Sequence, residues 1–192
     1  MSARPVPSGG AALVERLAAT LPGQPVRMLE THISWVLLSG DFAYKIKKPL
    51  SLGFLDFGTL DKRRRACEDE VRLNRRLAPE IYLGVAPIAG SPAAPQMEGS
   101  GEAIEYAVKM RRFAPEAAFD QLDARGRLAA AQIEAVAARL ARFHLHDCAR
   151  AGADDAWGSP DAIWRPAAQN LDQIAPHLDA PADRATLAAL RD

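Results

Sequence analysis

The stretch Phe42-Ala43-Tyr44-Lys45-Ile46-Lys47-Lys48 decides the fold of this chain. It predicts a β-strand, in which successive side chains point to opposite faces, so that Ala43, Lys45 and Lys47 share one face. Gly40-Asp41 lies directly before it and follows another β-rich run at residues 35–39. Because a Gly-Asp pair between two such runs favours a tight turn, we expect the two strands to form a hairpin.

Three further β-rich runs are expected to be strands, at residues 26–31, 81–88 and 104–110. A loop rich in Gly, Ser and Pro is expected at residues 89–101. One helix, capped by Thr59 and extending to about Leu77, is inserted after the third strand. About five strands with one inserted helix predict an α+β fold with an antiparallel sheet, because the chain lacks alternating βαβ units.

The chain becomes mainly helical after Phe113. Helices are expected at residues 118–122, 128–148, 161–178 and from 181 onward. The predicted organisation has three parts: a tail and short helix at 1–24, a sheet domain at 25–113 and a helical region at 114–192.

The charges of this 192-residue chain balance, with 24 Lys and Arg against 24 Asp and Glu. Nucleic-acid-binding proteins usually carry a basic excess on one face, so no nucleic-acid partner is expected. No run approaches the roughly 20 apolar residues of a membrane helix, so no membrane partner is expected either. Two distant cysteines, Cys67 and Cys148, lack metal-ligand spacing and favour a reduced, cytoplasmic protein without a metal site.

The inserted helix carries an acid at a position where a buried side chain is expected. Four residues recur at helical spacing and predict a buried stripe: Ala66, Glu70, Leu73 and Leu77. A buried carboxylate needs a cation, and Lys45 on the neighbouring strand supplies one. Two alternatives remain open at this point: Lys45, Lys47 and Lys48 form a solvated strand edge, or Glu70 reaches solvent at the edge of its helix.

Five motifs, taken together, resemble the N-terminal part of the aminoglycoside phosphotransferase-like family. They are His32-Ile33-Ser34-Trp35-Val36-Leu37-Leu38, Tyr44-Lys45-Ile46-Lys47-Lys48-Pro49, Gly53-Phe54-Leu55-Asp56-Phe57, Arg72-Leu73-Asn74-Arg75-Arg76-Leu77-Ala78-Pro79-Glu80 and Val108-Lys109-Met110-Arg111-Arg112-Phe113. The similarity covers roughly residues 25–150 and is closest to the branch often fused to a C-terminal P-loop ATPase or kinase domain. It implies a protein-kinase-like small lobe and hinge at 25–113, followed by the first helices of an incomplete, mainly α large lobe at 114–192.

The resemblance also implies a nucleotide site. Ala43 and Lys45 correspond to the V-A-I-K strand of kinases, in which the small residue leaves room for a base and the lysine contacts the phosphates of ATP. Glu70 orients that lysine, and Met110 and Arg111 belong to a hinge whose backbone binds adenine. The turn at residues 32–34 takes the place of the phosphate-covering loop but contains no glycine.

The catalytic loop of the family has no counterpart in this sequence, so no catalytic or metal-binding residue is assigned, and Mg²⁺ would need residues beyond Asp192. We therefore expect the nucleotide-binding part of an ATP-dependent phosphotransferase of an unidentified small molecule, inactive as this segment alone. The alternative is a non-catalytic nucleotide-binding or regulatory pseudokinase module. A third hypothesis is an α+β interaction domain in which the pair of Lys45 and Glu70 is only structural.

The triplet Asp56-Phe57-Gly58 has the composition of the metal-binding triplet of kinases. It lies between the lysine strand and the glutamate helix, whereas the kinase triplet follows the catalytic loop. We therefore expect Phe54, Leu55 and Phe57 to pack beneath the helix, with Gly58 in a turn.

Overall fold

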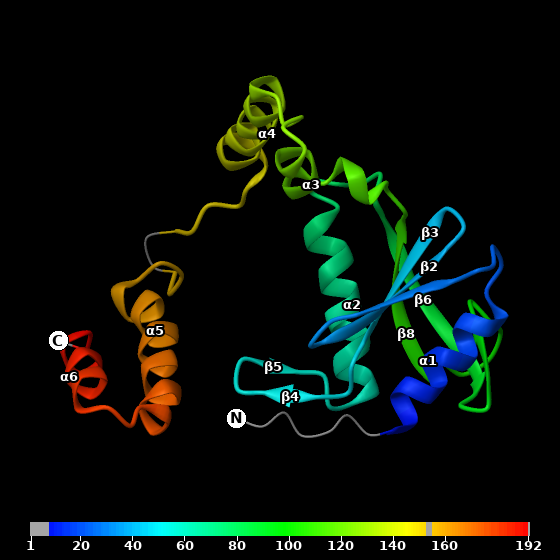
Figure 1. Cartoon of the computed structure of the whole chain (residues 1–192), viewed down its shortest axis with the longest axis horizontal. Helices are drawn as coiled ribbons and strands as arrows, with labels where there is room; N and C mark the ends of the chain where they lie inside the picture. The colour runs from blue at the N-terminus through cyan, green and yellow to red at the C-terminus, as the bar shows by residue number, and fades with distance from the viewer. Residues whose placement is uncertain (1–7, 153–154, 192) are drawn as a thin grey trace. The chain divides into compact units, whose positions relative to one another are not determined.

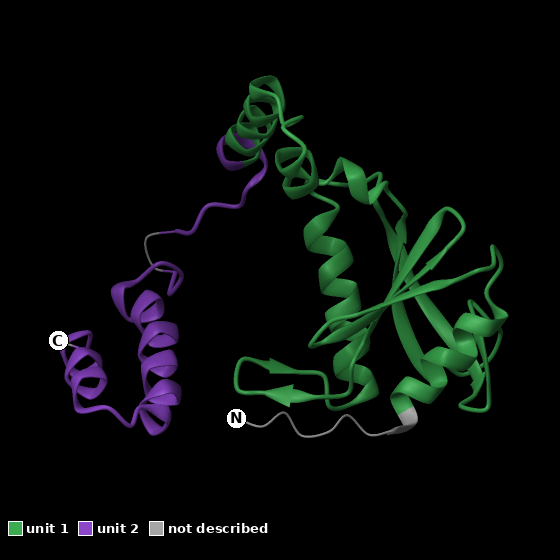
Figure 2. Ribbon diagram, in the orientation of Figure 1, with its two compact units in different colours: residues 1–143 green, residues 144–192 purple. Residues whose placement is uncertain are grey.

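The computed structural model describes residues 8–152 and 155–191, so residues 1–7 of the expected N-terminal tail lie outside it. The described chain forms two compact units, which lie within residues 1–143 and 144–192 (Figure 2). We call them the sheet unit and the helical unit. The expected divisions at residues 24 and 113 remain predictions.

The sheet unit begins with a helix and contains most of the secondary structure. Its elements are α1 (Ser8–Thr20), β1 (Arg27–Glu30), β2 (Ser34–Ser39), β3 (Phe42–Lys47), β4 (Ser51–Leu52), β5 (Leu55–Asp56), α2 (Leu60–Asn74), β6 (Tyr82–Ser91), β7 (Ala94–Met97), β8 (Glu105–Arg111), a 3₁₀ turn (Pro115–Ala117), α3 (Phe119–Ala124) and α4 (Ala130–Arg142). A π-helical turn, Phe143–Asp147, follows α4. The helical unit then contains α5 (Pro160–Ile174), a 3₁₀ turn (Ala175–His177) and α6 (Pro181–Ala189).

The sheet of the described residues has the strand order β1-β2-β3-β8-β6-β7, and all its neighbours are antiparallel (Figure 1). The predicted hairpin is confirmed: Ser39 pairs with Phe42 across a two-residue turn, in which Gly40 has a φ of 52°. Glycine reaches this left-handed region without steric cost. The structure confirms an α+β fold with an antiparallel sheet, but the sheet has six strands instead of about five.

The additional strand, β7, lies inside the segment that was expected to be a loop, at residues 89–101. This strand was not predicted from the sequence, because it contains Pro95 and proline cannot donate a hydrogen bond to a neighbouring strand. β7 is the edge strand of the sheet and pairs Pro95 with Gly90 of β6. An edge strand needs partners on one side only, which explains how the proline is tolerated.

The larger core cluster joins α1 to one face of the sheet. Leu17 of α1 packs in this cluster with Leu37 of β2 and with Tyr44 and Ile46 of β3. Tyr44 and Ile46 of β3 therefore point into this core, whereas the alternate side chains of β3, which include Lys45, lie on the opposite face of the sheet. This division is the one that the alternation in the sequence predicts.

α2 covers part of the opposite face beside β8 and β6 (Figure 1). Thr59 caps it as expected, since its side chain accepts a hydrogen bond from the Lys62 N–H. The predicted buried stripe is only partly correct: the Glu70 side chain is 14% exposed, but the most deeply buried residues of α2 are Arg63, Cys67 and Val71. Within the predicted stripe, Leu73 is 41% exposed.

A buried ion pair explains this rotation of α2. The Arg63 Nε donates to both carboxylate oxygens of Glu105 on β8, at 3.0 and 2.8 Å, and Nη1 donates to the Phe57 carbonyl at 2.9 Å. The predicted stripe did not include Arg63, whose acidic partner lies 42 residues away in the sequence. Turning the helix by one residue, about 100°, brings Arg63 inward and moves Glu70 to the edge of the buried face.

Two other packing expectations have different outcomes. Phe57 is buried, as expected, and the Asp56 carboxylate pairs with Lys62. Phe54 does not pack beneath the helix: it lies between β4 and β5, at the tip of their hairpin, and is 77% exposed.

The structure shows no helix that is long and apolar enough to cross a membrane within residues 8–152 and 155–191.

Candidate functional site

A cleft of about 770 Å³ opens on the face of the sheet that carries Lys45. All five residues predicted to bind the nucleotide line this cleft: Ala43, Lys45, Glu70, Met110 and Arg111. They come from β3, α2 and the end of β8, segments that are far apart in the sequence. The structure thus brings the predicted residues together in one place.

The apolar end of the cleft is formed by side chains that are paired across three strands. Leu38 of β2 pairs with Ala43 of β3, which pairs with Met110 of β8. Ala43 is buried and small, so it leaves space above this row that a larger side chain would fill. Tyr82 of β6 and Phe113 also line the cleft. Burial raises the pKa of the Tyr82 phenol, and the Glu70 charge adds to the effect, so Tyr82 stays neutral near pH 7.

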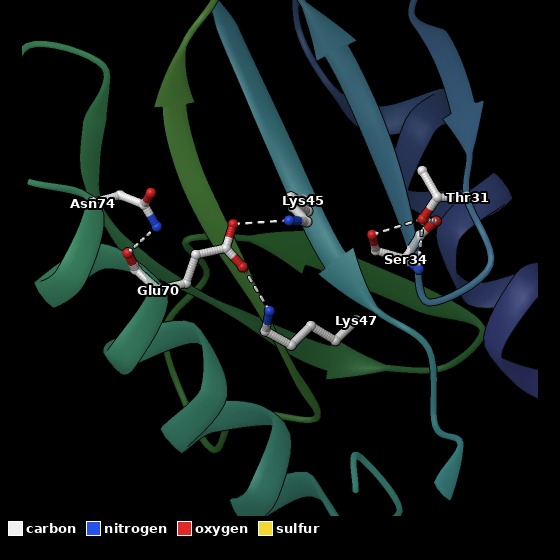
Figure 3. A network of polar contacts seen from close by, with 6 residues as sticks. All are labelled: Thr31, Ser34, Lys45, Lys47, Glu70 and Asn74. Atoms are coloured by element: carbon white, nitrogen blue, oxygen red, sulfur yellow. Dashed lines mark hydrogen bonds and ion pairs between the residues drawn. The ribbon is translucent and has the colours of Figure 1, made fainter. Parts of the chain in front are cut away.

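The charged end of the cleft contains Glu70 between two lysines (Figure 3). The Lys45 Nζ donates to Oε1 of Glu70 at 2.9 Å, and the Lys47 Nζ donates to Oε2 at 2.7 Å. The predicted pairing of Lys45 with Glu70 is therefore confirmed. The second partner, Lys47, was missed, although its position on the Lys45 face of β3 is the signal that could have identified it.

The burial of the lysines excludes the alternative in which they form a solvated edge. The Lys47 side chain is 6% exposed and that of Lys45 is 28% exposed. Lys48 is also buried and pairs with Glu30 at 2.6 Å. Burial by itself would raise the pKa of the Glu70 carboxyl, but hydrogen bonds and positive charge from Lys47 and Lys45 lower that pKa below its ordinary value. Glu70 is therefore ionised near pH 7, and it does not extend into solvent.

The turn between β1 and β2 borders the charged end through Thr31, Ile33 and Ser34. Its geometry depends on hydroxyl groups (Figure 3): the Ser34 N–H donates to the Thr31 Oγ1 at 3.0 Å, and the Thr31 N–H donates to the Ser34 carbonyl at 2.9 Å. The Ser34 and Thr31 hydroxyls also share a hydrogen bond of 3.0 Å. Hydrogen bonds to the side-chain hydroxyls thus hold the conformation of this turn. A glycine-rich loop would instead rely on the wider range of backbone conformations that glycine can adopt.

The predicted hinge residues meet the cleft where β8 ends. The N–H of Arg111 donates to the Ile81 carbonyl and that of Arg112 to the Asp41 carbonyl, each at 2.8 Å. These two donors are therefore engaged within the protein.

Asp120 and Gln121 of α3 also line the cleft. They were not singled out from the sequence, because they belong to a short polar helix without a motif. The described residues contain no group of three His, Cys, Asp or Glu side chains arranged to hold a metal ion.

Cys67 lies three residues before Glu70 on α2 and is fully buried, whereas Cys148 is partly exposed. Burial raises the pKa of the Cys67 thiol to about 12. Because the thiolate is the reactive form, we expect iodoacetamide at pH 8 to modify Cys148 in the folded protein and Cys67 only after unfolding. Peptide mass spectrometry of samples labelled with and without urea measures this difference. Equal labelling of both cysteines in the folded protein would contradict the packing of α2.

Comparison with known proteins identifies relatives without an assigned function. The chain is 36% identical over 150 residues to the uncharacterized proteins Rv2004c of Mycobacterium tuberculosis and Mb2027c of Mycobacterium bovis. The matched segment covers 78% of this chain and 28% of each relative, so the chain spans little more than a quarter of their length. Neither a protein-family model nor a solved structure matches the sequence.

Proposed function

We propose that this chain is the nucleotide-binding part of an ATP-dependent small-molecule phosphotransferase with a kinase-like small lobe. The observation that carries the proposal is an excess of positive charge. Lys45 and Glu70 line the cleft, and Lys47 is buried against Glu70, so the three side chains together carry one net positive charge. A purely structural pair would be neutral, whereas this cluster attracts an anion to a partly desolvated site.

The rest of the cleft supports a nucleotide as that anion. Its volume lies within the roughly 300–1,000 Å³ of small-molecule sites. The row of Leu38, Ala43 and Met110 offers a flat apolar surface to a base, and Asp120 offers a carboxylate to ribose hydroxyls. Since the N–H groups of Arg111 and Arg112 are engaged, we assign the hydrogen bonds to the base to hinge carbonyls and to the backbone of Phe113.

The resemblance to the aminoglycoside phosphotransferase-like family supplies the reaction in this proposal. Phosphate transfer to an unidentified small molecule would belong to the whole protein, with the fused P-loop domain that the resemblance suggests in the longer chain. One observation favours the non-catalytic alternative: the turn that borders the phosphate end is closed by Thr31 and Ser34 and contains no glycine. The alternative predicts that the longer chain binds ATP but produces no ADP from it.

A titration with ATP tests the proposal. We expect ATP to raise the free energy of unfolding by about 2.7 kcal/mol at a hundredfold excess over Kd, because only the folded state binds it. In Lys45→Met the phosphates lose their cation, so the effect of ATP should fall to that of adenosine. Urea unfolding with each ligand measures both. An ATP effect that is absent in the wild type, or unchanged in Lys45→Met, would show that the site is assigned wrongly.

A further inference from the structure

Lys48 holds the turn between β1 and β2 through three separate contacts. Its backbone N–H, directly after β3, donates to the Ile33 carbonyl at 2.9 Å. Its Nζ donates to Oε1 of Glu30, the last residue of β1, at 2.6 Å. The same Nζ lies 5.3 Å from the centroid of the Trp35 ring, which belongs to the core that packs against α1. Lys48 therefore contacts the strand before the turn, the turn itself and the strand after it.

The pair of Lys48 and Glu30 lies outside the cleft. The Lys48 side chain is 7% exposed and that of Glu30 is 59% exposed, and neither residue lines the cleft. The hydrogen bond and the charge of Lys48 lower the pKa of the Glu30 carboxyl, so Glu30 is ionised near pH 7. Because the two charges cancel, the pair adds no net positive charge to the phosphate end. Its effect on a ligand would therefore act through the position of the turn.

The turn itself has little freedom to adapt to a ligand. It contains no glycine, and the N–H groups of Thr31 and Ser34 are already engaged. Among the described residues, the N–H groups of His32 and Ile33 have no acceptor, so they are the backbone donors of this turn that remain for a phosphate. Donors that are held in place beforehand bind an anion more tightly than donors that the anion must first order.

We infer that Lys48 is a positioning residue, which through Glu30 and Ile33 holds the turn at residues 31–33 against the phosphate end of the cleft before a nucleotide binds. The inference rests on the proposed function of the cleft. A buried ammonium group without an acceptor is unfavourable, so in the absence of Glu30 the Lys48 side chain turns towards solvent and releases the turn. The phosphates then have to order the turn as they bind, which weakens their binding.

Calorimetric titration of the full chain with ATP and with adenosine tests this role in Glu30→Ala, because positioning and charge predict opposite results. Removing a negative charge would by itself strengthen the binding of anionic ATP. We instead expect Glu30→Ala to weaken ATP binding about fivefold, the effect of ordering one more side chain on binding, and to leave adenosine binding unchanged. Lys48→Met should weaken ATP binding to a similar extent.

Hydrogen exchange measures the position of the turn independently of affinity. Without ligand, peptides that cover residues 29–36 should exchange faster in Glu30→Ala than in the wild type, and saturating ATP should remove most of this difference. Peptides from β8 should exchange alike in both proteins, because the variant leaves the centre of the sheet intact. Faster exchange in β8 as well would indicate a general loss of stability.

Glu98 provides a matched control. It is 48% exposed and pairs with Lys109, whose Nζ lies 4.7 Å from the centroid of the Phe42 ring, so Glu98→Ala removes the same charge from a similar group of side chains away from the turn. This variant should bind ATP like the wild type. Since Glu30 is mostly exposed, Glu30→Ala carries the test where circular dichroism shows that Lys48→Met is not folded.

The outcomes separate the two proposals. A wild type that does not bind ATP overturns the proposed function and, with it, the role of Lys48. ATP binding that depends on Lys45 but is unchanged or tighter in Glu30→Ala overturns the role of Lys48 alone. Equal losses of ATP and adenosine affinity, or faster exchange throughout the sheet, also overturn it, because they show that the pair supports the fold and not the position of the turn.

Discussion

Replacing Glu105 by glutamine should lower the free energy of unfolding by about 3–5 kcal/mol, because Arg63 then remains buried without a counter-ion. The side chains of Arg63 and Glu105 are only 10% and 11% exposed, and Glu105 also accepts from the Tyr106 N–H at 3.0 Å. The substitution keeps the shape of the side chain and removes its charge. Urea unfolding followed by circular dichroism measures the loss. We expect a lower urea concentration at the midpoint and an unchanged dependence of the free energy of unfolding on urea concentration.

The exposed pair of Arg64 and Glu68 on the same helix is the control. Its side chains are about half exposed, so Glu68→Gln should change stability by only about 0.3–0.5 kcal/mol. A double variant with Arg63→Met and Glu105→Leu should regain much of the loss, since removing both charges leaves none unpaired. If Glu105→Gln proves no more harmful than Glu68→Gln, the buried pair is not what orients α2.

Removing the charge of Glu70 should have the next largest effect on stability. We expect Glu70→Gln to lose about 3 kcal/mol near pH 7, the lower end of the range for buried pairs, because Lys45 is partly exposed and can turn to solvent. The loss should depend on pH. The lowered pKa of the Glu70 carboxyl means that its contribution is fully present above the unfolded pKa of about 4.3 and is lost as pH falls through the folded pKa.

Urea unfolding of wild type and Glu70→Gln at several pH values between 7 and the acid limit measures this contribution directly. The difference between the two proteins should shrink as the pH falls below the ordinary range of carboxyl groups. Glu98→Gln removes the counter-ion of Lys109 from a half-exposed position and should lose at most about 1 kcal/mol. A difference for Glu70→Gln that stays constant or grows towards low pH would mean that the lysines do not stabilise the charged carboxylate.

Much of the candidate site could be predicted from the sequence. The alternation in β3 placed Ala43 and Lys45 on one face, and the need to neutralise Glu70 indicated its partner. Met110 was predicted from the family resemblance, and cross-strand pairing with Ala43 places it in the same cleft. These predictions depend on periods and pairings that hold for any strand or helix. The role of these residues in binding a nucleotide remains a prediction.

The sequence by itself determined the local structure: the hairpin at Gly40-Asp41, the helix cap at Thr59 and the division of β3 into two faces. Only the tertiary structure decided which side of α2 faces the sheet, that β7 joins the sheet at its edge, and that Lys47 shares Glu70 with Lys45. The physical reason is the range of the interactions. Turns, caps and strand alternation depend on residues within a few positions of each other, whereas the rotation of α2 depends on a buried pair whose members are 42 residues apart.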